Sequence, residues 1–325
     1  MSQLLILLIK DNDIYFIGDD KMKRVSSALE LIHNTPLIEL KKLKKELNLF
    51  GNIYAKLESF NLTGSVKDRI VSCILENMSL KKGDTIIEAT SGNTGISLSA
   101  IGALKGLRVI IIMPENMSKE RQKIIKAYGG QVIITPKDLG MDGAVNKAKE
   151  LLNSIPNSFS LNQFENHYNV LAHFNNTGPE IYSQLDGKID CFVAGIGTGG
   201  TISGVSKYLK KQNENIQVYG VEPLSSPLLT KGYAGSHKIQ GIGANFVPKT
   251  LNLDVIDKII DISDENAKKY VKLLAKLEGL LVGYSSGASL CAAVELAKNP
   301  QNKDKNIVVI LPDNGSKYLS TDLFD

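Results

Sequence analysis

The chain has 325 residues, of which 43% are apolar and 22% are charged, and this composition is typical of globular proteins. The 38 basic and 34 acidic residues leave a formal net charge of +4, too small to indicate binding to nucleic acid or to an anionic membrane. No apolar run approaches the roughly 18 residues of a membrane-spanning helix, and the length predicts two domains.

The cysteines and histidines form no metal-binding pattern. Cys73, Cys191 and Cys291 lack the spacing of metal ligands, and the four histidines are scattered along the chain. We therefore expect no metal site. Three cysteines cannot all pair with one another, which favours a reducing, cytoplasmic compartment.

Residues 1–21 are predicted to be an N-terminal extension. Within them, Leu4–Ile9 is a short apolar run. It has neither the preceding basic residue nor the following small-residue cleavage site of a signal peptide. We expect this run to form an edge strand or a loose arm.

Beyond the extension, helical patterns alternate with short and nearly continuous apolar runs. The predicted strands are Ile53–Leu57, Thr85–Ala89, Leu107–Met113, Val132–Thr135, Ile189–Ala194, Ile216–Val221, Ile259–Ile262 and Ile307–Leu311. The predicted helices are Lys67–Met78, Thr94–Leu104, Lys119–Tyr128, Gly143–Leu152, Thr201–Lys211, Asp264–Glu278 and Gly287–Ala297. Continuous apolar runs are typical of strands buried on both faces, so the alternation predicts an α/β protein with mostly parallel sheets.

The first loop of interest is Asn61–Arg69, which follows a predicted strand and opens a helix. Ligands of α/β proteins bind beyond the carboxyl ends of the strands. Lys67 lies in the first turn of the helix, where the positive helix terminus lowers the pKa of an amine. The neutral amine that results is the form that makes a Schiff base, although an isolated lysine here is also compatible with an ordinary surface residue.

The second loop, Thr90–Gly95, reads T-S-G-N-T-G and again opens a helix. Its backbone N–H groups, hydroxyls and amide suit a small anion such as a carboxylate. The same residues are equally compatible with an ordinary capped helix start.

The third loop, Gly195–Thr201, reads G-I-G-T-G-G-T and follows the strand Ile189–Ala194. Glycines allow the backbone to close around a phosphate at a helix terminus. Gly195, Gly197 and Gly200 also satisfy the dinucleotide pattern G-x-G-x-x-G, and Glu222 lies about twenty residues further on, as that pattern requires. A cup for a terminal monophosphate and a dinucleotide site both remain open on this loop alone.

The three loops in this order, with Lys67 in G-S-V-K-D-R, resemble the cysteine synthase / cystathionine β-synthase family. The resemblance extends to further motifs, which are Asn162–Phe164, Thr177–Glu180, His237–Gly243, Gly283–Gly287 and Leu311–Gly315. It covers roughly Val25 to Phe324. It implies pyridoxal 5′-phosphate as cofactor and fold type II, the tryptophan-synthase β-like fold. That fold has two interleaved three-layer α/β domains, here a large domain of residues 22–60 and 162–325 and a smaller one of residues 61–161.

The resemblance also implies roles for individual residues. Lys67 binds the cofactor covalently and acts as the catalytic base, Asn93 bonds the pyridine 3′-oxygen, and Ser285 faces the pyridine nitrogen. The cofactor phosphate is bound by Gly197, Thr198, Gly199, Gly200 and Thr201. The substrate is bound by Thr90, Ser91, Gly92, Asn93, Thr94 and Gln163, with Gly241 and Asn245 at the entrance. Ser285 could also serve as a helix cap.

These roles imply a β-replacement on an amino acid through an α-aminoacrylate intermediate. We expect a cysteine synthase that converts O-acetyl-L-serine and sulfide into L-cysteine and acetate. The resemblance further implies a homodimer, and a site that can accept the C-terminal tail of serine acetyltransferase.

Two departures from the cysteine synthase pattern leave an alternative open. Thr63-Gly64 is closer to the cystathionine synthase version of the loop, and Asn245 replaces a residue that is usually glycine in cysteine synthases and acidic in cystathionine synthases. An enzyme that consumes cysteine, releases sulfide and makes lanthionine, cystathionine or serine is therefore the alternative. A more remote one is an NAD-dependent oxidoreductase built on the third loop and Glu222.

Overall fold

The computed structural model describes residues 6–10, 13–17, 24–90 and 92–325. Its strands are β1 (Ile6–Lys10), β2 (Asp13–Ile17), β3 (Leu37–Glu39), β4 (Asn52–Leu57), β5 (Thr85–Ala89), β6 (Arg108–Pro114), β7 (Gln131–Thr135), β8 (Ser158–Phe159), β9 (Cys191–Gly195), β10 (Gln217–Pro223), β11 (Lys258–Ile262) and β12 (Asn306–Leu311). Its α-helices are α1 (Lys41–Leu47), α2 (Lys67–Glu76), α3 (Asn93–Lys105), α4 (Lys119–Ala127), α5 (Gly140–Ser154), α6 (His167–Ala172), α7 (Gly178–Gln184), α8 (Gly200–Gln212), α9 (Leu228–Lys231), α10 (Asp264–Glu278) and α11 (Tyr284–Ala297).

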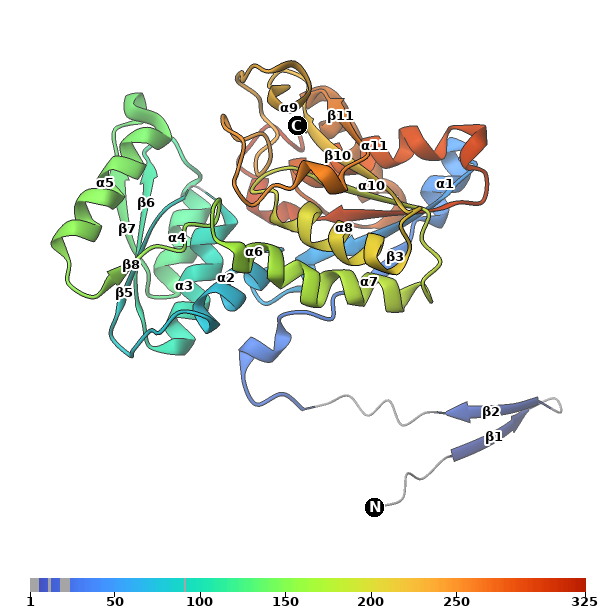
Figure 1. Cartoon of the computed structure of the whole chain (residues 1–325), viewed down its shortest axis with the longest axis horizontal. Helices are drawn as coiled ribbons and strands as arrows, with labels where there is room; N and C mark the ends of the chain where they lie inside the picture. The colour runs from blue at the N-terminus through green and yellow to red at the C-terminus, as the bar shows by residue number, and fades with distance from the viewer. Residues whose placement is uncertain (1–5, 11–12, 18–23, 91) are drawn as a thin grey trace.

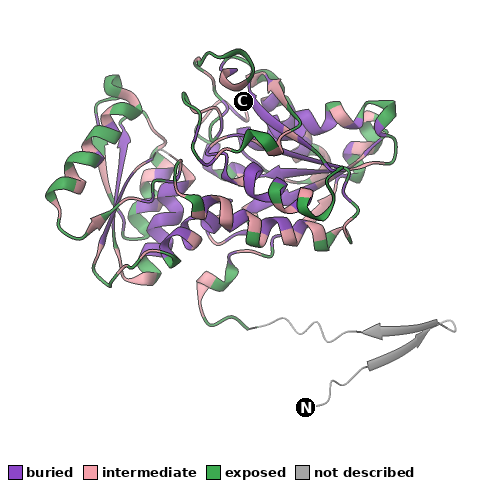
Figure 2. Cartoon of the chain, in the orientation of Figure 1, coloured by how far each residue is buried: buried purple, intermediate pink, exposed green. Residues whose placement is uncertain are grey.

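The larger sheet has the strand order β11-β10-β9-β12-β4-β3 (Figure 1). Its strands run parallel except for β3, which pairs antiparallel with β4. One face packs on α7 and α8 through Ile181, Ile202 and Val205, and the other packs on α10 and α11. Because both faces are covered, the central strands β9 and β12 are buried along nearly their whole length (Figure 2).

The smaller sheet has the order β7-β6-β5-β8 and all of its pairs are parallel. Helices α2, α3 and α4 cover one face with an apolar cluster that includes Ile70, Ile101 and Ile125. Helix α5 covers the other face with Ala144 and Ala148. Each sheet is therefore the middle of three layers, which confirms the α/β class and the fold type II expectation.

The strands β1 and β2 form a separate antiparallel two-stranded sheet. Ile6–Ile9 of the predicted apolar run thus lie in strand β1, which extends to Lys10, while Leu4 and Leu5 lie outside the described residues.

Most of the predicted elements are present, with shifted ends. Helix α10 has the predicted bounds because Ser263 caps its first turn and Gly279 ends it in the left-handed conformation. The strand predicted from Ile189 begins instead at Cys191, because that residue is the first to pair with β10 and β12. The short elements β3, β8, α1, α6, α7 and α9 had no prediction.

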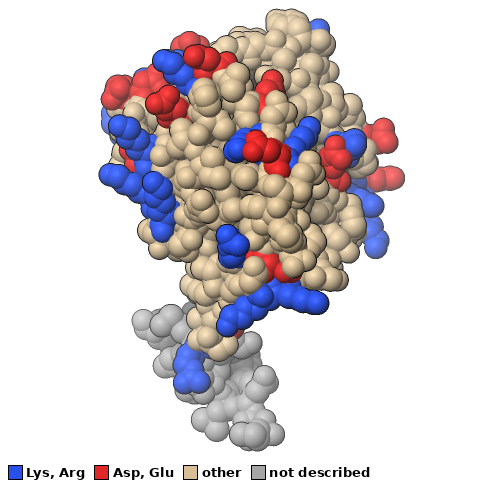
Figure 3. All heavy atoms as spheres, turned by 90° about the vertical axis from the view of Figure 1, so that its left-hand side faces the viewer, with Lys and Arg blue, Asp and Glu red and all other residues tan. Residues whose placement is uncertain are grey.

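The surface carries interspersed charges of both signs on the face that Figure 3 shows, in keeping with the small net charge. Within the described ranges, no helix is long and apolar enough to span a membrane, and no group of three or more metal-ligating side chains exists. Cys73, Cys191 and Cys291 are free thiols.

Candidate active site

Lys67 is the first residue of α2, directly after the loop that β4 and a short 3-10 helix lead into. Burial lowers the pKa of its amine, and the nearby Asp313 carboxylate restores it only in part. No described residue accepts a hydrogen bond from its Nζ. The structure therefore places at a helix start an amine that is biased towards the neutral, nucleophilic form.

Asp313 ties this lysine loop to the second predicted loop. The backbone of Ser65 forms an isolated bridge with Asp313, and the N–H of Val66 donates to the carbonyl of Pro312 at 2.8 Å. Asp313 Oδ2 accepts a hydrogen bond from Asn93 Nδ2 at 2.7 Å. The start of α2 and the start of α3 thus meet at the end of β12.

Thr94 and Gln163 continue the site from the second loop towards the third. Thr94 Oγ1 donates to Gln163 Oε1 at 2.9 Å, and both side chains are buried. Asn169 Nδ2 then donates to the Gln163 carbonyl at 2.7 Å and to Thr198 Oγ1 at 2.9 Å. A chain of hydrogen bonds therefore runs from α3 to the glycine-rich loop.

The glycine-rich loop in turn contacts the entrance loop and α11. A Cβ on Gly197 would lie 2.2 Å from the carbonyl oxygen of Gly241, so the backbones approach too closely for any side chain there. A Cβ on Gly241 would lie 3.7 Å from Ser285 Oγ. The N–H of Gly283 donates to the carbonyl of Asp313 at 3.3 Å, which closes the ring of contacts at its starting point.

Three long helices begin on this ring without a side-chain cap. They are α3, α8 and α11, and none of them has an acidic residue in its first turn. Among the long helices that begin elsewhere, α4 and α10 are capped by Ser118 and Ser263, and α5 lacks a cap but has the acidic Asp142 in its first turn. The first N–H groups of a helix need partners, and its terminus favours anions. The ring is therefore suited to a ligand that carries a phosphate and a carboxylate.

The structure brings most of the predicted site residues together. On the ring or beside it lie Lys67, Thr90, Gly92, Asn93, Thr94, Gln163, Gly197, Thr198, Gly199, Gly200, Thr201, Gly241 and Ser285. Ser91 lies outside the described residues. Gly92 has no atom within 4 Å of an added Cβ, which leaves open space beside the second loop. Asn245 is exposed on the entrance loop, next to Phe246.

Two of the sequence interpretations are corrected by these contacts. Ser285 does not cap α11, because the cap position is Gly283 and no side chain accepts a bond there. The Glu222 carboxylate accepts from Leu229 N at 2.9 Å, from Thr230 N at 2.9 Å and from Thr230 Oγ1 at 2.6 Å, so it caps α9. Glu222 thus has a structural use in this turn, which accounts for its position without the ribose that the dinucleotide interpretation requires.

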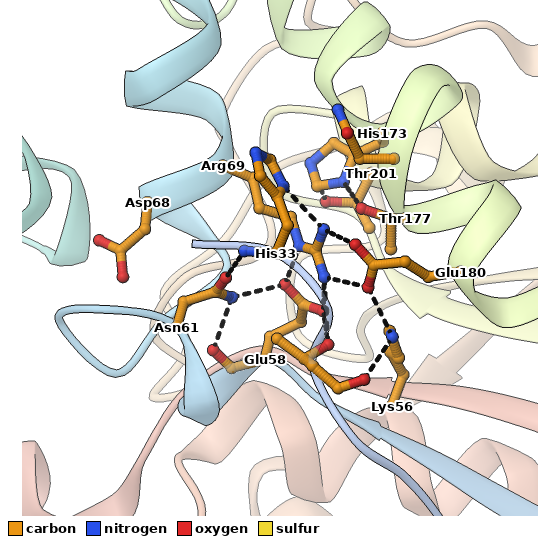
Figure 4. Close-up of polar contacts among 12 residues, drawn as sticks. His33, Lys56, Glu58, Asn61, Asp68, Arg69, His173, Thr177, Glu180 and Thr201 are labelled. Carbon is orange, nitrogen blue, oxygen red and sulfur yellow. Dashed lines mark hydrogen bonds and ion pairs between the residues drawn. The ribbon is translucent and has the colours of Figure 1, made fainter. Parts of the chain in front are cut away.

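His173 is a site residue that the sequence reasoning missed. Its Nε2 lies 3.1 Å from Thr201 Oγ1, and its Nδ1 lies 2.9 Å from Thr177 Oγ1 (Figure 4). Burial lowers the pKa of this imidazole to about 3, so it stays neutral at physiological pH. The imidazole of His173 thereby fixes the hydroxyl of Thr201 in the glycine-rich loop. The spacing of four residues signals the contact with Thr177, whereas Thr201 lies 28 residues away in sequence and has no such signal.

Behind the site lies a buried charge network of Lys56, Glu58, Arg69 and Glu180 (Figure 4). Arg69 Nε lies 2.6 Å from Glu58 Oε2, and Arg69 Nη1 lies 2.7 Å from Glu180 Oε1. Lys56 Nζ lies 2.7 Å from Glu180 Oε2. The two positive and two negative charges balance, and they fix α2, two residues after Lys67, against α7 and β4.

Comparisons with known proteins agree with this geometry. The family model described as "Pyridoxal-phosphate dependent enzyme" matches residues 28–313. Cysteine synthase B of Campylobacter jejuni is 52% identical over 308 residues, which cover 93% of this chain and 100% of that enzyme. The crystal structure of cysteine synthase from Entamoeba histolytica superimposes with a TM-score of 0.90 at 40% identity, covering 95% of this chain and 93% of the other. That of a hydrogen sulfide-producing enzyme from Fusobacterium nucleatum gives 0.87 at 41% identity, covering 91% and 100%.

Proposed function

We propose, from the premise that this chain belongs to the family of pyridoxal-phosphate dependent enzymes, that it makes L-cysteine from O-acetyl-L-serine and sulfide. The observation that carries the proposal is the amine of Lys67, which has no hydrogen-bond partner among the described residues and lies inside a ring of uncapped helix starts. Cysteine synthases at 52% and 45% identity over 93% of the chain support the same reaction.

The residues on the ring fit pyridoxal phosphate. Lys67 would bind its carbonyl carbon, and the loop Gly197–Thr201 at the start of α8 would hold its phosphate. Asp313 Oδ1 is buried and has no hydrogen-bond partner in the described part of the chain, and Ser285 is buried beside Gly241. These polar atoms line the remainder of the ring. When bound, the cofactor supplies the electron sink for bonds made and broken next to the substrate α-carbon.

Lys67 then serves as the general base. Once the substrate amine has displaced it, its neutral Nζ takes the proton from the α-carbon, and it returns that proton after the new bond forms. The carboxylate of the substrate lies against the second loop, where Asn93, Thr94 and Gln163 hold it. Acetate leaves the β-carbon with the electron pair of the C–O bond, and the sulfur of sulfide forms the replacing C–S bond. Ser285 would face the cofactor nitrogen with a neutral hydroxyl, and a neutral partner there would favour replacement over transamination.

Activity assays on the loaded protein test the proposal. Wild-type protein with pyridoxal phosphate should release cysteine and acetate in equal amounts from O-acetylserine and sulfide. Borohydride reduction followed by peptide mass mapping should find the cofactor on Lys67. Lys67→Ala should lose both signals, and Lys81→Ala, which removes an exposed lysine, should lose neither. A loaded wild-type protein that produces no cysteine overturns the proposal.

The entrance loop favours a second reaction, in which the thiol of cysteine is replaced by another nucleophile and sulfide is released. Asn245 is exposed there and departs from the cysteine synthase pattern, and a hydrogen sulfide-producing enzyme of known structure is 41% identical. An amide can only hydrogen-bond, so Asn245 would orient a second amino acid such as cysteine without activating it. We expect slow sulfide release from cysteine alone.

Nucleophile competition tests the role of Asn245. Asn245→Gly should shift the preference from cysteine towards sulfide, and Val247→Ala, in the same loop and 53% exposed, should leave it unchanged. An unchanged ranking of nucleophiles in Asn245→Gly contradicts the role.

The resemblance to the family supports three further proposals. The protein acts as a cytoplasmic homodimer, which sedimentation and cell fractionation test. Its site accepts the C-terminal tail of serine acetyltransferase, which a titration with the tail peptide tests. Residues 61–161, which carry β5 to β8, move as the smaller domain when substrate binds, and hydrogen exchange with and without substrate measures that movement.

A further inference from the structure

Lys317 is a buried cation at the site that the proposed chemistry does not use. It lies on the short 3-10 helix Gly315–Tyr318 after β12 and is only 6% exposed. Its Nζ donates to Asn93 Oδ1 at 2.9 Å and to the carbonyl of Gly64 at 3.3 Å. A lysine held this way contacts the first and second loops at once.

These contacts determine which way the Asn93 amide faces. An ammonium group has donors only, so it must face the amide oxygen. The amide nitrogen is then left to donate to Asp313 Oδ2, as observed at 2.7 Å. The flipped amide would place its N–H groups against the Lys317 ammonium and its oxygen against the Asp313 carboxylate. Both contacts would be repulsive, so one orientation is strongly preferred.

The Asn93 nitrogen retains one hydrogen after the bond to Asp313. Asn93 is partly exposed at the start of α3, beside the open space at Gly92. A ligand on that side therefore meets a hydrogen-bond donor. A donor of this kind, polarised by a cation on its carbonyl oxygen, selects an anionic oxygen.

We propose that Lys317 is a positioning residue, which fixes Asn93 as a hydrogen-bond donor towards an anionic ring oxygen of the bound cofactor. The inference rests on the proposed function, together with the resemblance to the family, which places the cofactor 3′-oxygen against the Asn93 side chain. Lys317 itself touches neither cofactor nor substrate in this scheme.

The surroundings of Lys317 hold it in place. Tyr318 Oη donates to Asp313 Oδ2 at 2.7 Å, and the guanidinium of Arg121 lies 5.1 Å from the centre of the Tyr318 ring. Burial lowers the pKa of Lys317, the charges of Asp313 and Asp68 raise it, and Arg121 lowers it further. The turn thus joins β12 to α3 and α4, and Lys317 has little freedom to choose another partner.

Ligand pairs that differ only at the ring oxygen test the role. Pyridoxine 5′-phosphate and its 3-deoxy analogue both lack the aldehyde, so neither can bind Lys67 covalently. The measured quantity is the ratio of their dissociation constants on the apoprotein. In the wild-type protein we expect the 3-hydroxy ligand to bind about 10-fold more tightly or better, as for one hydrogen bond to a charged group. Equal affinity overturns the proposal, and this measurement does not depend on any variant folding.

Variants of Lys317 then separate positioning from a structural role. Lys317→Met should reduce that ratio, because the Asn93 amide loses the cation that polarises its oxygen and only Asp313 still orients it, and Lys317→Arg should retain most of the ratio. Ser316→Ala, on the exposed side of the same turn, should leave the ratio unchanged. Equal weakening of both ligands by Lys317→Met shows a structural role only and overturns the inference. A wild-type protein that binds no pyridoxal phosphate overturns the proposed function instead.

Discussion

Replacing Glu180 by glutamine removes one charge from the buried charge network and nearly nothing else. The other three members then carry a net charge of +1 in a site where Lys56, Glu58 and Arg69 are fully buried. Breaking a buried ion pair by removing one partner costs about 3–5 kcal/mol, because the remaining charge is uncompensated.

The pKa of Glu180 gives an independent magnitude. Burial alone would raise it, but hydrogen bonds and charges from Arg69 and Lys56 lower it from 4.5 to about 2. At about 1.4 kcal/mol for each tenfold change in proton affinity, this corresponds to about 3 kcal/mol. The folded-state pKa is depressed, so this stabilisation is present above about pH 4.5 and is lost as the pH falls towards 2.

The assay is urea unfolding followed by far-UV circular dichroism, because the chain has no tryptophan. Glu180→Gln should lower the free energy of unfolding at pH 7 by about 3 kcal/mol. The double variant Lys56→Met/Glu180→Gln restores neutrality and should regain more than half of that loss. Glu150→Gln disrupts an exposed pair with Lys147 and should cost less than about 0.5 kcal/mol. A Glu180→Gln protein as stable as Glu150→Gln would refute the reasoning.

Three further predictions concern single residues. Gly197→Ala should weaken retention of pyridoxal phosphate about 10-fold or more, since the new Cβ would lie 2.2 Å from the Gly241 oxygen; equilibrium dialysis measures it, and unchanged retention contradicts the close approach. The His173 imidazole should stay unprotonated from pH 5 to 8 in ¹H–¹⁵N NMR spectra, because burial lowers its pKa to about 3; a titration near the ordinary value would contradict its burial. Burial raises the pKa of Glu88 to about 7 despite hydrogen bonds from Ser160 and the backbone of Leu161, so its contribution to stability is full below about pH 4.5 and is lost as the pH rises through 7. The melting temperature of Glu88→Gln should therefore rise relative to that of the wild type as the pH increases from 5 to 8. A difference in melting temperature that does not change with pH would contradict this.

The predictable parts of the fold are those with local signals. The strand Thr85–Ala89 has the predicted bounds, since five residues in a row are buried or nearly so between polar turns. Helix α1 was missed because K-K-L-K-K-E-L buries only Leu43, and so lacks a repeating apolar face. Helices α6 and α7 were missed because a π-helical segment, His173–Thr177, lies between them and interrupts their periodicity.

The candidate site also has parts that the sequence predicts and parts that it does not. Loops that open helices, such as the one before Lys67, can be recognised in the sequence because glycines and hydroxyl-bearing residues cluster there. The partners that orient those loops are not visible, since Asp313 and Lys317 lie more than 200 residues from Asn93. Glu222 shows the converse error, because the spacing that suggested a ribose ligand belongs to a helix cap.

The uncapped helix starts around Lys67 have a consequence for the lifetime of the protein. A missing cap costs a helix about 1 kcal/mol, so three such starts leave the empty chain weaker where both sheets meet. A ligand that binds only the folded state adds about 4 kcal/mol of stability at a thousandfold excess over its dissociation constant. Cofactor supply would then control the abundance of the enzyme as well as its activity, because chains made during vitamin B6 shortage would unfold more often and be degraded sooner.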